Sequence, residues 1–133
     1  MANALYDKGR EAFLSGSISW TSDNIKVALV DTGSYTVNLS THQYVSSLSG
    51  VTATSSNLGS KTATNGVADA SDVTYSALSG AQSEALVIYK DTGTASTSPL
   101  IAYIDTATGL PVTPNGSDIT ITWDNGANKI FKL

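Results

Sequence analysis

The feature that most constrains the fold is a series of short apolar stretches, each bounded by residues that favour turns. Within residues 25–30, for example, apolar side chains occupy every second position, which is the period of a strand with one buried side. The same pattern predicts strands at 17–20, 25–30, 61–64, 67–69, 73–78, 84–90, 100–105, 119–123 and 129–133. Eight or nine such strands are enough to form a sandwich.

Three Asn-Gly pairs, at 65–66, 115–116 and 125–126, supply residues that tolerate the positive φ of tight hairpin turns. We expect the first pair to join strands 61–64 and 67–69. Residues 124–128 are expected to fold strand 119–123 back against the C-terminal strand, and strand 17–20 to pair with strand 25–30. Because long crossover helices are missing from the pattern, the pairing should be antiparallel.

Helical patterns are short. Residues 4–14 place Leu5, Ala12 and Phe13 on one side, and Gly16 ends the pattern. A second short helix is predicted from Ser40, which has capping-box spacing to Gln43. The predicted fold is mainly β: one domain over 1–133, an antiparallel β-sandwich or a jelly-roll-like barrel, with residues 1–15 as a helical N-terminal segment. Residues 46–60 are predicted to be a flexible loop or a weak edge strand.

Composition excludes several classes of function. The chain has no cysteine and only one histidine, which argues against disulfides, thiolate chemistry and a structural zinc site. Seven basic residues against eleven acidic ones give a net charge of −4, which disfavours nucleic acid as a partner. Residues 1–15 have no continuous apolar run, so we expect neither a signal peptide nor a membrane anchor and predict synthesis in the cytoplasm.

Charged residues make up only 14% of the chain, and serine and threonine replace them. Such a surface suits close-packed copies, because few like charges are brought together on assembly. An ordinary sandwich, in which threonine is favoured anyway, explains the same composition.

One motif indicates catalysis. Asp31-Thr32-Gly33 and a second Asp-Thr-Gly at 91–93 each follow an apolar run, as in aspartic proteases, where two aspartates share a proton. Neither copy is followed by the apolar-apolar-glycine segment of those enzymes, and Asp-Thr-Gly is also typical of a turn that ends a strand. We therefore expect two turns.

Other candidate chemistry is weaker. His42 is expected to cap a helix or face solvent rather than act as a base, and no phosphate-binding loop is present. Acidic residues at 69, 72, 118 and 124 have no EF-hand spacing, so neither a metal nor a cofactor is predicted. The aromatic residues offer a sugar-stacking or subunit-contact surface, but packing in the core explains them more simply; they are Trp20, Tyr35, Tyr44, Tyr75, Tyr89, Tyr103 and Trp123.

Five segments in order carry a resemblance that spans most of the chain. They are ALYDKGREAFL at 4–14, NIKVALVD at 24–31, ALVIYKDTG at 85–93, SPLIAYID at 98–105 and ITITWD at 119–124. In this order they resemble a group of small virion structural proteins of tailed bacteriophages, variously capsid decoration (cement), head-fibre or tail-associated proteins.

The resemblance implies a non-enzymatic virion component. On the physical reading, a compact β domain with a helical arm and low surface charge favours a decoration protein, bound to the major capsid protein of the head. Cement proteins are commonly homotrimers, so a trimer is expected. The alternative is a head-fibre or tail-associated protein that binds a receptor or glycan. We expect Tyr6, Arg10 and Phe13, together with the loop at 51–60, to contact the partner. In the alternative interpretation, Leu5 and Phe13 only cap the core.

Overall fold

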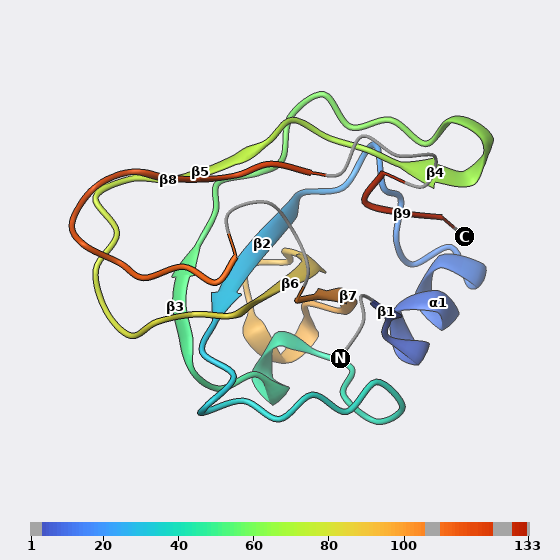
Figure 1. Cartoon of the computed structure of the whole chain (residues 1–133). Coiled ribbons are helices and arrows are strands. Elements are labelled where there is room, and N and C mark those ends of the chain that lie inside the picture. The colour runs from blue at the N-terminus through green and yellow to red at the C-terminus, as the bar shows by residue number, and fades with distance from the viewer. Residues whose placement is uncertain (1–3, 106–109, 124–128, 133) are drawn as a thin grey trace.

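The computed structural model describes residues 4–105, 110–123 and 129–132. Its centre is a five-stranded antiparallel sheet in the order β1-β7-β6-β2-β3 (Figure 1). Two two-stranded ribbons, β4-β9 and β5-β8, accompany it. The strands are β1 Ala4–Leu5, β2 Ile25–Val30, β3 Val51–Thr54, β4 Val67–Ala68, β5 Val73–Tyr75, β6 Ala85–Lys90, β7 Leu100–Ile104, β8 Ile119–Ile121 and β9 Phe131–Lys132.

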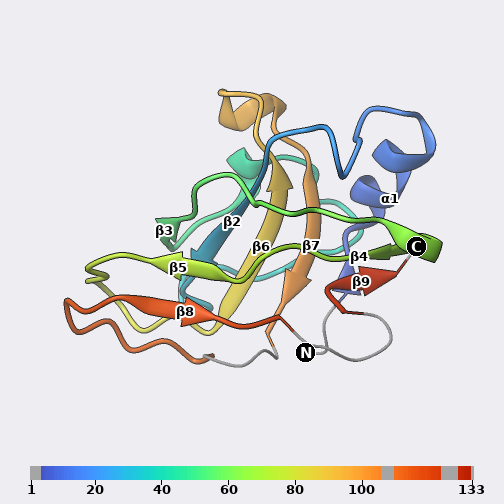
Figure 2. The same ribbon diagram turned by 90° about the horizontal axis from the view of Figure 1, so that it is seen from above.

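The central strands are buried on both sides, so each sends alternate side chains into two separate cores. Along β6, Leu86 and Ile88 join the first core, whereas Val87 and Tyr89 join the second. The two ribbons cover the first core with side chains such as Ile121 from β8. Figure 2 shows these ribbons as a layer in front of the sheet. The predicted mainly β, sandwich-like fold with a short N-terminal helix is confirmed.

An irregular segment covers the second core. Residues 35–48 contribute Tyr35, Val37, Leu39, Val45 and Leu48 to it. The only regular piece of this segment is a 3-10 turn, η1 Val45–Ser47. The sheet is thus packed between paired strands on one side and a chain segment with little regular structure on the other (Figure 1).

The N-terminal helix is shorter than the pattern predicts. α1 spans Asp7–Leu14, whereas Ala4–Leu5 form the edge strand β1, paired with Tyr103 and Ala102 of β7. The helix predicted from Ser40 is wrong: the Asn38 side chain accepts hydrogen bonds from the Ser40 and Thr41 N–H groups, which closes a turn there.

Residues 17–20 were expected to form a strand, and this is also wrong. Ile18 and Trp20 are buried and alternate with exposed serines, as the pattern requires. However, the Ser17 N–H donates to the Ala12 carbonyl oxygen at the helix end, and the Ser19 N–H donates to Asp23. These backbone groups therefore have partners other than a neighbouring strand.

The turn chemistry is partly confirmed. Asn65 and Gly66 both have positive φ, in η2 Thr64–Gly66, and the Thr62–Asp69 bridge closes the hairpin around them. The predicted pairing of 119–123 with the C-terminal strand is wrong, because β8 pairs with β5 and β9 pairs with β4. The Asn-Gly pair at 125–126 lies outside the described residues.

Residues 46–60 contain β3, which is the last strand of the sheet and pairs with β2. Of the two expectations for this stretch, the edge strand is confirmed. In the part of the chain that the structure describes, no helix has the length and apolar character needed to cross a membrane.

Candidate functional site

Helix α1 carries Arg10 and Phe13, two of the residues predicted to bind a partner, and it is packed tightly against the sheet. A Cβ atom added at Gly9 would lie 2.6 Å from the carbonyl oxygen of Leu100 in β7. Just before the helix, the Tyr6 N–H donates to the Ile101 carbonyl oxygen at 3.0 Å. A glycine at position 9 therefore lets the helix backbone contact the strand backbone directly.

The three predicted contact residues lie in different surroundings. Tyr6 is completely buried, in the second core. Arg10 is exposed and forms an ion pair with Asp7 at 3.2 Å. Phe13 is half-buried, with its ring 6.1 Å from that of Phe131. The structure thus places Arg10 and part of Phe13 at the surface, whereas the Tyr6 side chain is part of the interior.

Tyr6 is the inner end of a chain of polar side chains. Its hydroxyl lies 2.8 Å from the Tyr35 hydroxyl, which in turn lies 2.7 Å from Nδ1 of His42. Burial, and then the hydrogen bond to Tyr35, raise the pKa of the Tyr6 hydroxyl well above its usual value, so Tyr6 stays neutral. The histidine therefore helps to fix residues 35–42 against the second core.

An apolar groove of about 260 Å³ lies on one side of α1. Phe13 lines it together with Trp20 and Phe131, whose rings meet edge to face at 5.2 Å. The smaller residues of its wall are Ser19, Thr21, Ala63, Gly66 and Ala68. Leu14, the neighbour of Phe13, is 90% exposed. Helix α1 thus ends in a protruding leucine, and the residue before it lines an apolar groove.

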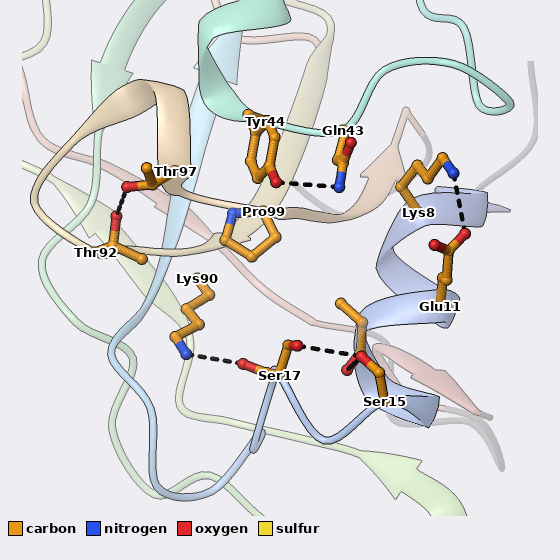
Figure 3. A pocket seen from close by; sticks show the side chains of 11 residues that line it. Lys8, Glu11, Ser15, Ser17, Gln43, Tyr44, Lys90, Thr92, Thr97 and Pro99 are labelled. Carbon is orange, nitrogen blue, oxygen red and sulfur yellow. Dashed lines mark hydrogen bonds and ion pairs between the residues drawn. The ribbon is translucent and has the colours of Figure 1, made fainter.

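A larger, polar groove of about 430 Å³ lies on another side of the helix (Figure 3). From α1 it receives Lys8, Glu11 and Ala12, and from the C-cap Ser15, whose spacing places them on one helix face. Three other segments complete the lining, with Ser17, Gln43, Tyr44, Lys90, Thr92, Thr97 and Pro99. Four stretches of sequence therefore converge on one surface depression.

The charges of the polar groove are paired. Lys8 lies 3.1 Å from Glu11. Lys90 lies 3.2 Å from Asp23 and donates to the Ser17 carbonyl oxygen at 2.8 Å. The groove consequently presents hydroxyl, amide and aromatic groups without an uncompensated charge among these residues.

The two Asp-Thr-Gly motifs do not form a catalytic dyad. Asp31 follows the end of β2 that pairs with Ala85, and Asp91 follows the end of β6 that pairs with Ile25. Because β2 and β6 are antiparallel over six residue pairs, the aspartates lie at opposite ends of the sheet. Each instead accepts a hydrogen bond from the glycine N–H two residues later, at 2.9 and 3.0 Å, so both motifs are the expected turns.

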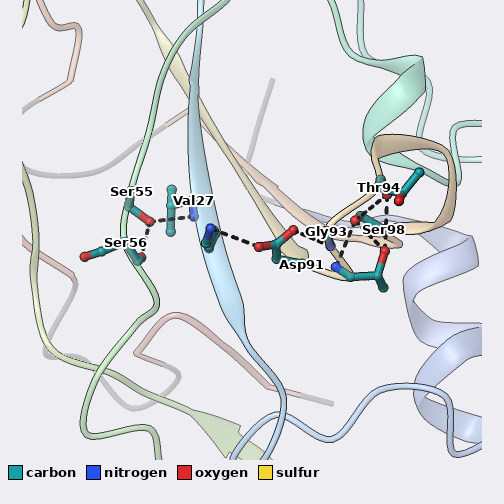
Figure 4. Close-up of polar contacts among 9 residues, drawn as sticks. Val27, Ser55, Ser56, Asp91, Gly93, Thr94 and Ser98 are labelled. Atoms are coloured by element: carbon teal, nitrogen blue, oxygen red, sulfur yellow. Dashed lines mark hydrogen bonds and ion pairs between the residues drawn. The ribbon is translucent and has the colours of Figure 1, made fainter.

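Asp91 has a further partner at its end of the sheet. Lys26 lies 2.9 Å from it, and Figure 4 shows Asp91 beside Gly93, whose N–H donates to it. These contacts, the Lys26 hydrogen bond first, lower the pKa of the Asp91 carboxyl. Beyond Asp91, the buried Ser98 hydroxyl accepts from the Thr92 N–H and donates to the Thr94 carbonyl oxygen, which fixes the loop around η3 Ala95–Thr97.

The acidic residues considered as calcium ligands serve turns and strand ends. Asp118 accepts from the Ala77 N–H, and Asp72 accepts from the Trp123 N–H. Among the residues that the structure describes, no three histidine, cysteine or acidic side chains come together as a metal site. Asp124 lies outside those residues.

Sequence reasoning missed the polar groove. Gln43, Thr97 and Pro99 belong to no recognisable motif, and Tyr44 was expected to be a core residue. Tyr44 is half-buried and borders the groove, whereas the other six aromatic residues considered above are buried as expected. The bridge between Tyr44 and Pro99 that brings these segments together is a tertiary contact without a local signal.

Comparison with known proteins gives no relative for this chain: no protein-family model matches it, and no curated protein is significantly similar in sequence.

Proposed function

We propose that this chain is a non-enzymatic structural component of a tailed-bacteriophage virion, a capsid decoration protein that binds the assembled head. The sequence resemblance supports this role. The observation that carries it physically is the exposed Leu14 at the end of α1, whose chain neighbour Phe13 lines an apolar groove with Phe131. Burial of one large apolar side chain contributes about 1.5–3 kcal/mol, which is a useful share of a contact repeated over a shell.

The partner in this proposal is the major capsid protein. A protein that binds only the assembled shell stabilises that shell by its binding free energy. The low surface charge supports such packing, because neighbouring copies repel one another weakly. A trimer would further cover the outer side of β3, which ends the sheet and exposes Val51.

The direct test mixes the purified protein with emptied, undecorated phage capsids and measures occupancy by cryo-electron microscopy. Regular density between capsomers is expected. Complete absence of density on the shell would contradict the decoration role and favour the head-fibre or tail-associated alternative.

A point variant is more informative here than truncation of residues 1–15, because loss of the buried Tyr6 would disturb the second core. Leu14→Asp places a charge on the protruding side chain and should reduce capsid occupancy at least tenfold, which corresponds to about 1.4 kcal/mol. Ser79→Asp adds the same charge at another exposed position and should bind like the wild type. Equal capsid occupancy of the two variants would show that α1 is not part of the capsid contact.

A further inference from the structure

The polar groove, of about 430 Å³, is not used by the proposed capsid contact. From its geometry we infer that it is a binding site for a neutral, hydroxyl-rich ligand, namely a short stretch of an uncharged saccharide. The inference does not depend on where in a virion the chain is located, and it is tested separately.

The groove is large enough and its walls are fixed. Its volume of about 430 Å³ lies within the range of roughly 300–1,000 Å³ that is usual for small-ligand sites. Backbone hydrogen bonds join two of its walls: the Val45 N–H donates to the Ser98 carbonyl oxygen at 2.9 Å, and the Leu100 N–H donates to the Gln43 carbonyl oxygen at 2.8 Å. The loop beside them is fastened by the buried Ser98 hydroxyl. Binding therefore requires little further ordering of these walls, which keeps its entropic cost low.

The helix wall is equally fixed. The close contact of Gly9 with the β7 backbone sets the distance between α1 and the strand that leads out of Pro99. Figure 3 shows Tyr44 beside Pro99, with the helix side chains across the depression from them. The opening is thus bounded by a helix on one side and an apolar platform on the other.

The lining matches the chemistry of a sugar. Tyr44 and Pro99 supply apolar surface on which the C–H face of a pyranose can pack. Around this platform lie groups that both donate and accept hydrogen bonds, such as the Thr97 hydroxyl and the Gln43 amide. The Gln43 amide donates to the Tyr44 hydroxyl at 3.2 Å, so this hydroxyl accepts from Gln43 and keeps its own proton for donation.

Charge selects against ionic ligands. The ammonium groups of Lys8 and Lys90 are paired with Glu11 and Asp23. A phosphate or carboxylate ligand would have to break one of these ion pairs, and a cationic ligand would meet the same lysines. A neutral ligand leaves both ion pairs intact and is not repelled by the lysines. It can form hydrogen bonds with the hydroxyl and amide groups directly.

The experiment is an amide NMR titration of the intact protein with three neutral hexasaccharides, namely maltohexaose, cellohexaose and hexa-N-acetylchitohexaose, with inorganic phosphate as the charged comparison. At least one saccharide should shift amides of residues 43–44 and 92–99 and of the helix face. If no saccharide perturbs these amides, or if phosphate perturbs them at lower concentration than every saccharide, the inference is wrong.

Two variants identify the groups responsible. Gln43→Ala and Thr97→Val each remove one hydrogen-bonding group and should weaken the saccharide by about three- to tenfold. Thr74→Val removes an exposed hydroxyl on the distant ribbon, where Thr74 faces Thr120, and should leave the affinity unchanged. Equal weakening by all three variants, or by none, would overturn the assignment. Capsid occupancy of Gln43→Ala should equal that of the wild type, which separates this site from the proposed docking of α1.

Discussion

The two faces of the central sheet are covered by different means. Paired strands of the two ribbons cover the first core, and its interior is largely aliphatic, with residues such as Ile88 and Ile121 completely buried. The irregular segment 35–48 covers the second core, where Tyr6 and Tyr35 join hydroxyls. Regular strands satisfy their own backbone groups, whereas an irregular cover needs specific side-chain hydrogen bonds to hold its position. Polar contacts occur in both cores: in the first, single side chains donate to backbone carbonyl oxygens, as the Tyr75 hydroxyl does to Val27, whereas in the second two side-chain hydroxyls bond each other.

The largest effect is expected from a deletion in the first core. Ile88→Ala leaves a cavity at a fully buried position and should lower the free energy of unfolding by about 2–5 kcal/mol. Urea denaturation would measure this loss. The adjacent Val87→Ala, which faces the second core, is the matched control and should cost less because fewer methyl groups are removed. A larger loss for Val87→Ala would show that the second core tolerates a cavity less well than the first.

The next effect concerns helix α1, whose Ala12 and Phe13 pack against the first core. Gly9→Ala brings a Cβ atom against the Leu100 carbonyl oxygen, and the helix must shift. We expect a loss of about 1–3 kcal/mol in unfolding free energy, as for other overpacked contacts. Gly59→Ala is a suitable control, because a Cβ atom at Gly59 would have no neighbour within 4 Å. If Gly9→Ala were as stable as the wild type, α1 could move away from the sheet without a loss of unfolding free energy.

A smaller effect is expected from the polar contacts of the second core. Tyr6→Phe keeps the ring but removes the hydroxyl that bonds Tyr35, and should destabilise the fold by about 0.5–1.5 kcal/mol. Hydrogen exchange should become faster mainly in residues 35–48. If exchange became equally fast in both ribbons, the ribbons and the irregular segment 35–48 would instead unfold together.

The smallest effect is expected at the end of the sheet, in the ion pair of Lys26 and Asp91. Asp91→Asn should cost less than about 1 kcal/mol at neutral pH, as for other pairs at a surface. The pKa of Asp91 is lowered in the folded protein, so its stabilisation is present above the pKa of the unfolded state and is lost as the pH falls through the folded pKa. Wild type and Asp91→Asn should therefore converge in stability in acid. A difference that persists at low pH would contradict this linkage.

The sequence predicted strand bounds best where consecutive residues are buried on both sides of the sheet. The strands at 25–30, 84–90 and 100–105 were predicted nearly to their observed bounds, because they consist of apolar runs that end in turn residues. β1 was missed because Ala4 and Leu5 also fit the helical pattern, and only pairing with β7 makes them extended. The partners of β8 and β9 were misassigned because a chain neighbour was favoured over a distant strand.

The candidate sites were less accessible to sequence reasoning. Arg10 and Phe13 lie where a helix in an amphipathic segment would place them, but the burial of Tyr6 depends on its extended backbone just before Asp7. The polar groove is assembled from four stretches of chain whose side chains show no common pattern. Its existence follows from the antiparallel contact of Tyr44 with Pro99, which no local preference specifies.

The pairing of β1 with β7 has a consequence for the timing of folding during synthesis. Ala4 is opposite Tyr103, so the first strand waits for nearly a hundred residues before its partner exists. At roughly 5–20 residues per second, this delay is on the order of 5–20 s. β4 has a shorter but still long wait, because Val67 is opposite Lys132 of β9. Most of residues 4–132 must therefore be synthesised before both pairings can form, and such non-local pairings slow folding.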